Sequence, residues 1–141
     1  IEGKPVVIMD DFKKSLLRVV NTKSAPDPVG PYNQCIVHGN TAYLSGQIAI
    51  HPETNELITN SIEAETHQVM SNIQSLLNEL NIDFSRIIKC SIFIADMNQF
   101  HAINEVYASY FDTYFPAREC VEVSVLPKHV NVEISVIAAL D

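Results

Sequence analysis

The stretch Phe115-Pro116-Ala117-Arg118-Glu119-Cys120-Val121-Glu122-Val123-Ser124-Val125-Leu126-Pro127 decides how the rest of the chain is interpreted. A proline stands near each end, and proline suits strand boundaries because its φ is fixed and it has no N–H. The side chains between the prolines alternate in character, which predicts a β-strand with two distinct faces. These faces consist of Val121, Val123 and Val125 on one side and Arg118, Cys120, Glu122 and Ser124 on the other. We expect an antiparallel strand with a dry valine face and a wet polar face that begins with a guanidinium and a thiol.

Length and charge limit the class of protein. The 141 residues predict a single domain, which we place at residues 18–141, with residues 1–17 as an N-terminal extension or processing remnant. A formal net charge of -8 without a basic stripe argues against nucleic-acid binding, because phosphate backbones repel such a surface. No apolar run approaches the roughly 20 residues that span a bilayer, which argues against a membrane protein.

The spacing of cysteine and histidine bears on the redox compartment and on metal binding. The three cysteines, Cys35, Cys90 and Cys120, form no CxxC pair, and their odd number fits a disulfide framework poorly. We therefore expect reduced thiols and a cytoplasmic location, with mitochondria or another organelle left open by residues 1–17. None of the five histidines stands at ligand spacing from another histidine or a cysteine, so no metal site is predicted.

Hydrophobic periodicity predicts the element order β-β-β-α-β-α-β-β. The expected strands cover 18–22, 35–38, 41–47, 87–94, the opening stretch and 130–139, and the expected helices cover about 62–80 and a segment with apolar positions at 100–111. Both helices are long enough to be crossovers on one face of a mixed sheet. Ile92 and Ile94 point opposite to Phe93, so the uncovered face is also apolar, and we expect it to pack against further copies of the chain.

Turn and cap residues mark where these elements begin and end. Gly39-Asn40 is a two-residue hairpin signal, and Gly46 is typical of a bulge or a close backbone approach. Asn60 with Glu63 resembles a capping box before the first helix. Asn81 is suited to a left-handed helix end.

Two charged residues are the main candidates for chemistry. Arg118 is either a surface arginine paired with Glu119 or Glu122, or a fork that clamps a planar carboxylate through two parallel hydrogen bonds. Glu133 is either a solvent-facing acid or a carboxylate that orients or deprotonates water, with a pKa raised by partial burial.

Four further polar residues are ordinary when each is considered alone. Cys120 is either a small core hydrophobe or, beside Arg118, a site wall or a thiol of lowered pKa. No histidine stands in a motif-like relation to it, which argues against a thiol-protease type of nucleophile. Tyr32, Ser45 and Asn104 are a turn aromatic, a strand-end hydroxyl and a helix-surface amide.

Considered together, these residues form an ordered set of motifs. They are Gly30-Pro31-Tyr32, Ser45-Gly46-Gln47, Asn104 followed by Tyr107, Phe115-Pro116-Ala117-Arg118-Glu119-Cys120, Leu126-Pro127-Lys128 and Val132-Glu133-Ile134. In order and spacing the set resembles the Rid family, the reactive-intermediate deaminases also called YjgF-like proteins, over about residues 18–140. The Pro-Ala-Arg-x-Cys segment is the most diagnostic part, and its arginine resembles that of the deaminase-type subgroup.

The resemblance implies a fold, an assembly and an activity. The fold would be α+β and chorismate-mutase-like, in a homotrimer with a barrel-like core and three clefts between subunits. The activity would be hydrolysis of 2-imino or enamine acids, such as 2-aminoacrylate, to 2-keto acids and ammonia, without a metal or cofactor. Arg118 would bind the substrate carboxylate, Cys120 would line the pocket through its N–H or thiol, and Glu133 would position water. Tyr32, Ser45, Gly46 and Asn104 would shape the cleft, some of them from the neighbouring subunit.

Other functions remain open at this point. A non-catalytic regulator could bind small acids in the same clefts, because a carboxylate clamp also accepts 2-keto acids. Ribonuclease or translation-inhibitor activity is attributed to some relatives. The acidic charge of this chain and its lack of a basic aromatic surface argue against that activity here. A holdase-like chaperone role is also attributed to some relatives, and the sequence neither supports nor excludes it.

Overall fold

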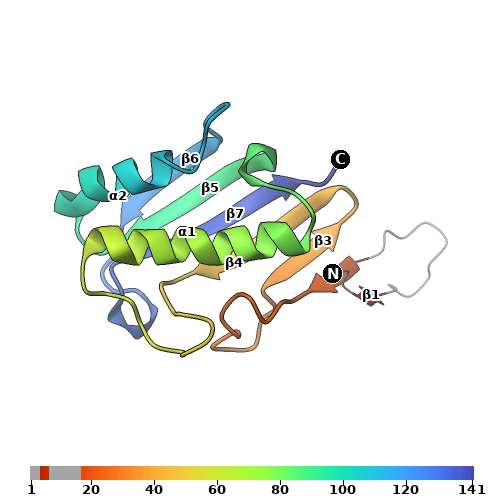
Figure 1. The fold of residues 1–141 in the computed structure, drawn as a ribbon, viewed down its shortest axis with the longest axis horizontal. Coiled ribbons are helices and arrows are strands. Elements are labelled where there is room, and N and C mark those ends of the chain that lie inside the picture. The colour runs from red at the N-terminus through yellow and green to blue at the C-terminus, as the bar shows by residue number, and fades with distance from the viewer. Residues whose placement is uncertain (1–3, 7–16) are drawn as a thin grey trace.

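The Gly39-Asn40 hairpin joins two neighbouring antiparallel strands, β3 (Cys35–His38) and β4 (Thr41–Gln47), as predicted. Gly39 has a φ of 61°, a left-handed conformation that glycine adopts without steric cost. The computed structural model describes residues 4–6 and 17–141. Within them the chain forms a seven-stranded mixed sheet in the order β1-β2-β3-β4-β7-β5-β6 (Figure 1).

Apart from β1, the remaining elements follow the predicted order. They are β1 (Lys4–Val6), β2 (Leu17–Val20), α1 (Ile62–Glu79), β5 (Ile87–Ile94), α2 (Phe100–Ala108), β6 (Ala117–Glu122) and β7 (Val132–Ala139), with short 3-10 turns at Phe84–Arg86, Met97–Gln99 and Pro127–His129. All neighbouring strands pair antiparallel except β5 and β6, which are parallel and joined through α2. A helix is the usual crossover between parallel strands, because a short turn cannot join them.

One strand lies in the segment that the sequence analysis placed outside the domain. β1 pairs antiparallel with β2, so residues 4–6 extend the sheet at the edge opposite β6. The interpretation of residues 1–17 as a processing or targeting extension otherwise concerns residues 1–3 and 7–16, which lie outside the described part of the chain.

Helix α1 begins at Ile62, as predicted, but its N-cap lies one residue later than expected. Ser61, with extended backbone, is the N-cap, and its hydroxyl accepts a hydrogen bond from the Ala64 N–H (3.0 Å). Asn60 therefore does not form the expected capping box, because the hydroxyl of the next residue satisfies the free N–H. The predicted end is confirmed: Asn81 has a φ of 60° directly after the last turn.

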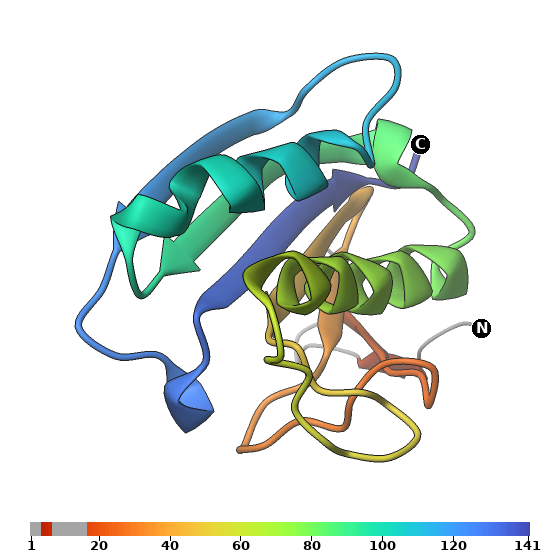
Figure 2. The same ribbon diagram turned by 60° about the vertical axis from the view of Figure 1, so that its left-hand side comes forward.

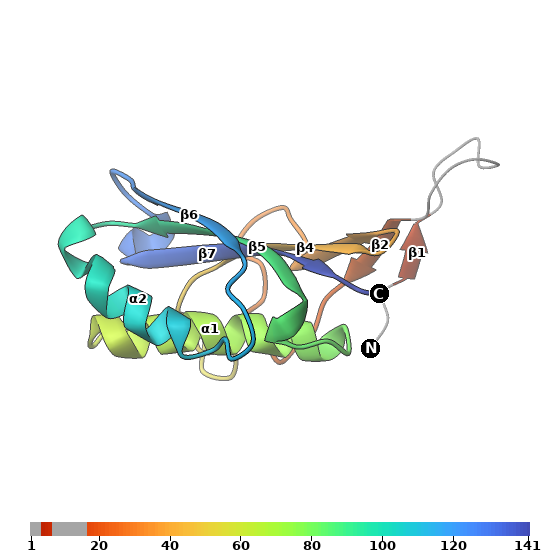
Figure 3. The same ribbon diagram turned by 90° about the horizontal axis from the view of Figure 1, so that it is seen from above.

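Both helices cover the same face of the sheet, as predicted (Figures 2 and 3). The core lies between them and the sheet, and its largest fully buried side chains include Met70, Ile73, Leu76, Leu77, Ile92, Ile94 and Ile134. The uncovered face includes Phe93 and the exposed Tyr43. No helix among the described residues is long and apolar enough to cross a bilayer.

Within a single chain, the assignment of a dry and a wet face to β6 does not hold. In the register with β5, Arg118 lies beside Cys90 and Cys120 beside Ile92, and these two β5 side chains are buried under the helices. Val121 lies instead on the uncovered face and is 43% exposed. The strand ends at Glu122, and it is a parallel edge strand rather than an antiparallel one. Alternation identified the two faces, but it could not show which of them the helices cover.

Candidate functional site

A cavity of about 270 Å³ lies between α2 and the start of β6. Its lining residues are Asn104, Tyr107 and Ala108 from α2 and Phe115, Pro116 and Arg118 from the segment that enters β6. The cavity thus combines one charged group and one amide with mostly apolar walls. Small-molecule sites commonly have this composition.

Arg118 is held in place by neutral groups. Its Nη1 donates to Asn104 Oδ1 (2.5 Å), and its Cζ lies 5.1 Å from the centroid of the Tyr107 ring and 5.6 Å from that of Phe100. Aromatic faces attract a guanidinium without neutralising it. The group is half-buried, and no acid pairs with it among the residues that the structure describes.

The interpretation of Arg118 as a surface arginine paired with Glu119 or Glu122 is therefore wrong. Glu119 points to the uncovered face, where it pairs with Lys89 (Nζ to Oε1, 3.1 Å) and accepts a hydrogen bond from Ser91. Glu122 accepts a hydrogen bond from the Met97 N–H (2.7 Å). Both neighbouring acids are thus engaged elsewhere, and the guanidinium retains its positive charge for an added anion.

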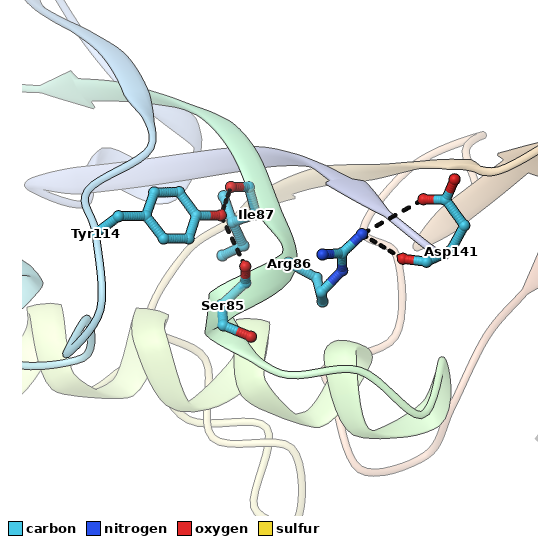
Figure 4. Close-up of polar contacts among 5 residues, drawn as sticks. All are labelled: Ser85, Arg86, Ile87, Tyr114 and Asp141. Carbon is cyan, nitrogen blue, oxygen red and sulfur yellow. Dashed lines mark hydrogen bonds and ion pairs between the residues drawn. The ribbon is translucent and has the colours of Figure 1, made fainter.

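The segment that brings Arg118 to the cavity is anchored by Tyr114. Its hydroxyl donates to the Ser85 carbonyl (2.8 Å) and also contacts the Ile87 carbonyl, at the start of β5 (Figure 4). Nearby, Arg86 contacts the main-chain oxygen and the carboxylate of Asp141. The Tyr114 contacts fix the connection between α2 and β6 four residues before Arg118, and the sequence analysis did not identify them.

The thiol of Cys120 lies on the same face as Arg118 but packs against the core and does not line the cavity. Burial raises the pKa of Cys120, and the opposing effect of Arg118 is smaller. The expectation of a lowered pKa is therefore wrong, because loss of hydration outweighs the neighbouring charge. Burial likewise raises the pKa of Cys90 to about 11. Neither thiol is activated as a nucleophile at neutral pH.

Glu133 lies on the opposite face of the sheet from Arg118. It pairs in register with Phe93, whereas Arg118 lies beside Cys90, and those two residues of β5 are three positions apart. Side chains at odd spacing point to opposite faces of a strand. Burial raises the pKa of the half-buried Glu133, which confirms that part of the prediction.

The carboxylate of Glu133 rests against bare backbone at Gly46. A Cβ atom at position 46 would lie 2.0 Å from Glu133 Oε2, closer than any real contact. The pairing of β4 with β7 is irregular between Leu44 and Gln47, which confirms the predicted bulge and close approach at this glycine. Only glycine lets the carboxylate occupy this place.

Tyr32 and Ser45 lie near Gly46 and are organised by a residue that the sequence analysis did not single out. Gln34 is buried, and its amide donates to the carbonyls of Thr22 (3.1 Å), Ala25 (3.2 Å) and Pro26 (2.7 Å). This shapes the proline-rich loop, in which the exposed Tyr32 accepts from the Val29 N–H (3.2 Å). Tyr32 and Gly46 line one small hollow. Ser45 donates its backbone N–H to the Gln34 carbonyl (2.9 Å) and its hydroxyl to the Asn33 carbonyl (2.6 Å).

The predicted site residues therefore form two groups. Arg118, Asn104 and Cys120 lie on the helix-covered face or at its edge, and only the first two line the cavity. Glu133, Gly46 and Tyr32 lie at the other face, near the junction of β4 and β7. A single chain does not bring these two groups together.

Comparison with known proteins identifies similar chains. Residues 22–140 match the family described as Endoribonuclease L-PSP. A RutC family protein of Sulfurisphaera tokodaii is 46% identical and is aligned over 87% of this chain and 98% of its own length. The 2-iminobutanoate/2-iminopropanoate deaminase of Dermatophagoides farinae is 41% identical, over 88% of this chain and 97% of its own.

A solved structure shows the same fold. The crystal structure of E. coli TdcF with bound serine is 35% identical, covers 86% of this chain and 98% of its own, and has a TM-score of 0.83. The agreement extends over nearly the whole described chain, so the mixed α+β sheet with two helices on one face is the fold shared by these proteins.

Proposed function

Because this chain belongs to the Endoribonuclease L-PSP family, which includes the Rid proteins, we propose that it hydrolyses 2-imino acids to 2-keto acids and ammonia. The proposed site is composite, with Arg118 and Asn104 from one copy of the chain and Glu133, Gly46, Tyr32 and Ser45 from another. Relatives named 2-iminobutanoate/2-iminopropanoate deaminase, from Dermatophagoides farinae and Homo sapiens, support the choice of substrate class.

The observation that carries the proposal is the acid-free guanidinium of Arg118 at the wall of the cavity. A 2-imino acid has a carboxylate next to its reacting carbon, and the planar fork of arginine matches a carboxylate through two parallel hydrogen bonds. Asn104 already orients one nitrogen of the fork. Binding the carboxylate in this way would hold the reacting carbon at one defined place.

The remaining chemistry is addition of water and loss of ammonia. An enamine such as 2-aminoacrylate first takes a proton at carbon and becomes the iminium form. Water then adds to the C=N carbon, its proton passes to Glu133, and the resulting carbinolamine releases ammonia as the carbonyl forms. A carboxylate of raised pKa suits both steps, because it can take the proton from water and return it to the leaving amine. In this proposal Cys120 contributes its backbone N–H.

A second copy of the chain supplies what one copy lacks. The two groups of site residues lie on opposite faces of the sheet, so neither is complete alone. The uncovered face has apolar side chains, among them Tyr43, Phe93 and Val121, and such a face is expected to be covered. The homotrimer implied by the motifs would cover this face and bring the groups together at three clefts.

The test measures 2-keto acid release from freshly generated 2-aminoacrylate and 2-iminobutanoate. We expect the wild-type chain to accelerate release and Arg118→Ala to abolish the acceleration. Arg118→Lys should restore little, since lysine keeps the charge but loses the fork. Arg86→Ala, which removes an arginine that stands directly before β5 and contacts Asp141, is the matched control and should keep the wild-type rate. An unchanged rate in Arg118→Ala would remove the basis of the proposal.

Regulation by small-acid binding is a second candidate. The TdcF relative was crystallised with serine, a saturated amino acid that cannot undergo imine hydrolysis. If the wild-type chain binds a 2-keto acid through Arg118 but does not accelerate imine hydrolysis, this alternative replaces the first.

A further inference from the structure

Glu65 is the only charged residue in the described part of the chain that is buried, with 0% of its surface exposed. It lies in the first turn of α1, where the helix dipole favours a negative charge. Its neighbour in the same turn, Glu63, is exposed and offers a comparison. Burying a carboxylate is costly unless its oxygens are hydrogen-bonded, so the partners of Glu65 are informative.

Both oxygens of Glu65 bind a single residue. Oε2 accepts from the backbone N–H of Asn131 (2.7 Å), and Oε1 accepts from the Asn131 side-chain Nδ2 (2.8 Å). The carbonyl of Asn131 in turn accepts from the N–H of Ala95 (3.0 Å), directly after β5. The start of α1, the end of β5 and the entry to β7 therefore meet at Asn131, and Figure 1 shows these segments at the same end of the sheet.

Asn131 stands two residues before Glu133. Glu133 pairs with Phe93, two residues before Ala95, so the contacts of Asn131 fix the first paired residues of β7 against β5. A slip of one residue would turn every side chain of a strand to the other face. The place of Glu133 beside Gly46 depends on this register.

We propose that Glu65 is a positioning residue for Glu133: by holding Asn131 with both oxygens, it fixes how β7 presents the Glu133 carboxylate beside Gly46. The catalytic consequence rests on the function proposed above, whereas the position of Glu133 does not. A purely structural Glu65 would instead stabilise α1 and leave the surroundings of Glu133 unchanged.

The experiment compares Glu65→Ala, Glu65→Gln and Glu65→Asp with Glu63→Ala, in the full chain. Three quantities are measured: kcat and KM for 2-iminobutanoate, binding of a 2-keto acid, and the Glu133 pKa by NMR of carboxyl carbons. The 2-keto acid reports on Arg118, which lies on the other face of the sheet. The NMR titration requires no enzymatic activity.

Glu65→Ala leaves the N–H of Asn131 without its acceptor, and we expect kcat to fall about 10- to 100-fold with little change in KM. The Glu133 pKa should move toward the ordinary glutamate value as its surroundings loosen. Glu65→Gln should retain most of the activity, because its oxygen can accept from the N–H and its NH₂ can donate to a rotated Asn131 amide. Glu65→Asp, whose side chain is one methylene shorter, should have a kcat between those of Glu65→Ala and Glu65→Gln. Glu63→Ala should match the wild type in kcat and in the Glu133 pKa.

A folded Glu65→Ala chain with the wild-type kcat and Glu133 pKa would overturn the inference. If that variant does not fold, Glu65→Asp decides, and wild-type values there would overturn the inference equally. If the wild-type chain shows no imine hydrolysis, the proposed function fails, and the Glu133 pKa alone decides whether Glu65 positions this carboxylate.

Discussion

Arg118 and Glu133 lie on opposite faces of one sheet, on strands β6 and β7 with β5 between them. Neither residue has an opposite charge paired with it in the described chain. If both act on one substrate, they must come from different copies of the chain.

Mixing two inactive variants tests this directly. Arg118→Ala and Glu133→Gln are unfolded together and refolded as a mixture, and imine hydrolysis is then measured. In a randomly mixed ring with shared sites, about one quarter of the sites would regain both intact residues. Each variant refolded alone is the control and should stay inactive. No recovery in mixed oligomers would place the site within one chain.

The titration of Glu133 predicts a pH dependence of stability. Because its pKa is raised above 4.5 on folding, the folded chain holds this proton more tightly than the unfolded chain. The stabilising contribution is therefore fully present below the unfolded-state pKa and is lost as the pH rises through the folded-state pKa. Glu133→Gln, which resembles the protonated form, should melt higher than the wild type at neutral pH but not at pH values below the ordinary glutamate pKa. Thermal unfolding of both proteins at the two pH values checks this. An equal increase in the melting temperature of Glu133→Gln at both pH values would contradict the prediction.

Gly46→Ala should displace the Glu133 carboxylate, because the added Cβ would lie 2.0 Å from Oε2. Overpacking of this kind costs about 1–3 kcal/mol of unfolding free energy, and imine hydrolysis should be largely lost. Gly30→Ala is the matched control, since its added Cβ meets the Tyr32 ring at 3.6 Å, an ordinary contact. Urea unfolding and activity of both variants provide the comparison.

Tyr114→Phe removes the hydroxyl that ties the segment before β6 to the start of β5. We expect a loss of about 1 kcal/mol in stability and a higher KM, because Arg118 becomes less well placed. Tyr110→Phe is the matched control. It also removes one tyrosine hydroxyl, but that hydroxyl is hydrogen-bonded to His67 Nδ1 (2.8 Å) away from the cavity. It should destabilise the chain without changing KM, and equal KM values in the two variants would argue against an anchoring role for Tyr114.

Cys120→Ala should retain most of the hydrolytic activity. The thiol is directed at the core and its pKa is raised by burial, so only the backbone N–H remains for the substrate. Alkylation by iodoacetamide at neutral pH should accordingly be slow. Inactivation of the wild type by this reagent, with Cys120→Ala resistant and inactive, would show that the thiol participates.

Much of the fold was predictable because short-range signals determine it. The Gly39-Asn40 hairpin, the end of α1 at Asn81 and the close approach at Gly46 each depend on a local backbone requirement. The assignment of the faces of β6 does not hold within a single chain because their burial depends on where α1 and α2 pack, and alternation contains no such information.

The candidate site was predictable in part, and for the same reason. Arg118 and Asn104 meet as the motifs imply, and the raised pKa of Glu133 follows from partial burial. The supporting residues Gln34, Glu65 and Tyr114 were not found, because their partners lie between 8 and 66 positions away along the chain. A glutamine before a strand or a glutamate in the first turn of a helix is ordinary until its partner is known.

Gly46 also has a consequence for protein engineering. Where Glu133 rests, the floor of the proposed pocket is main chain, which cannot be tailored by exchanging side chains. A library aimed at bulkier acids should leave that junction untouched and diversify the opposite wall, where Ala108 is small and Phe115 is 65% exposed.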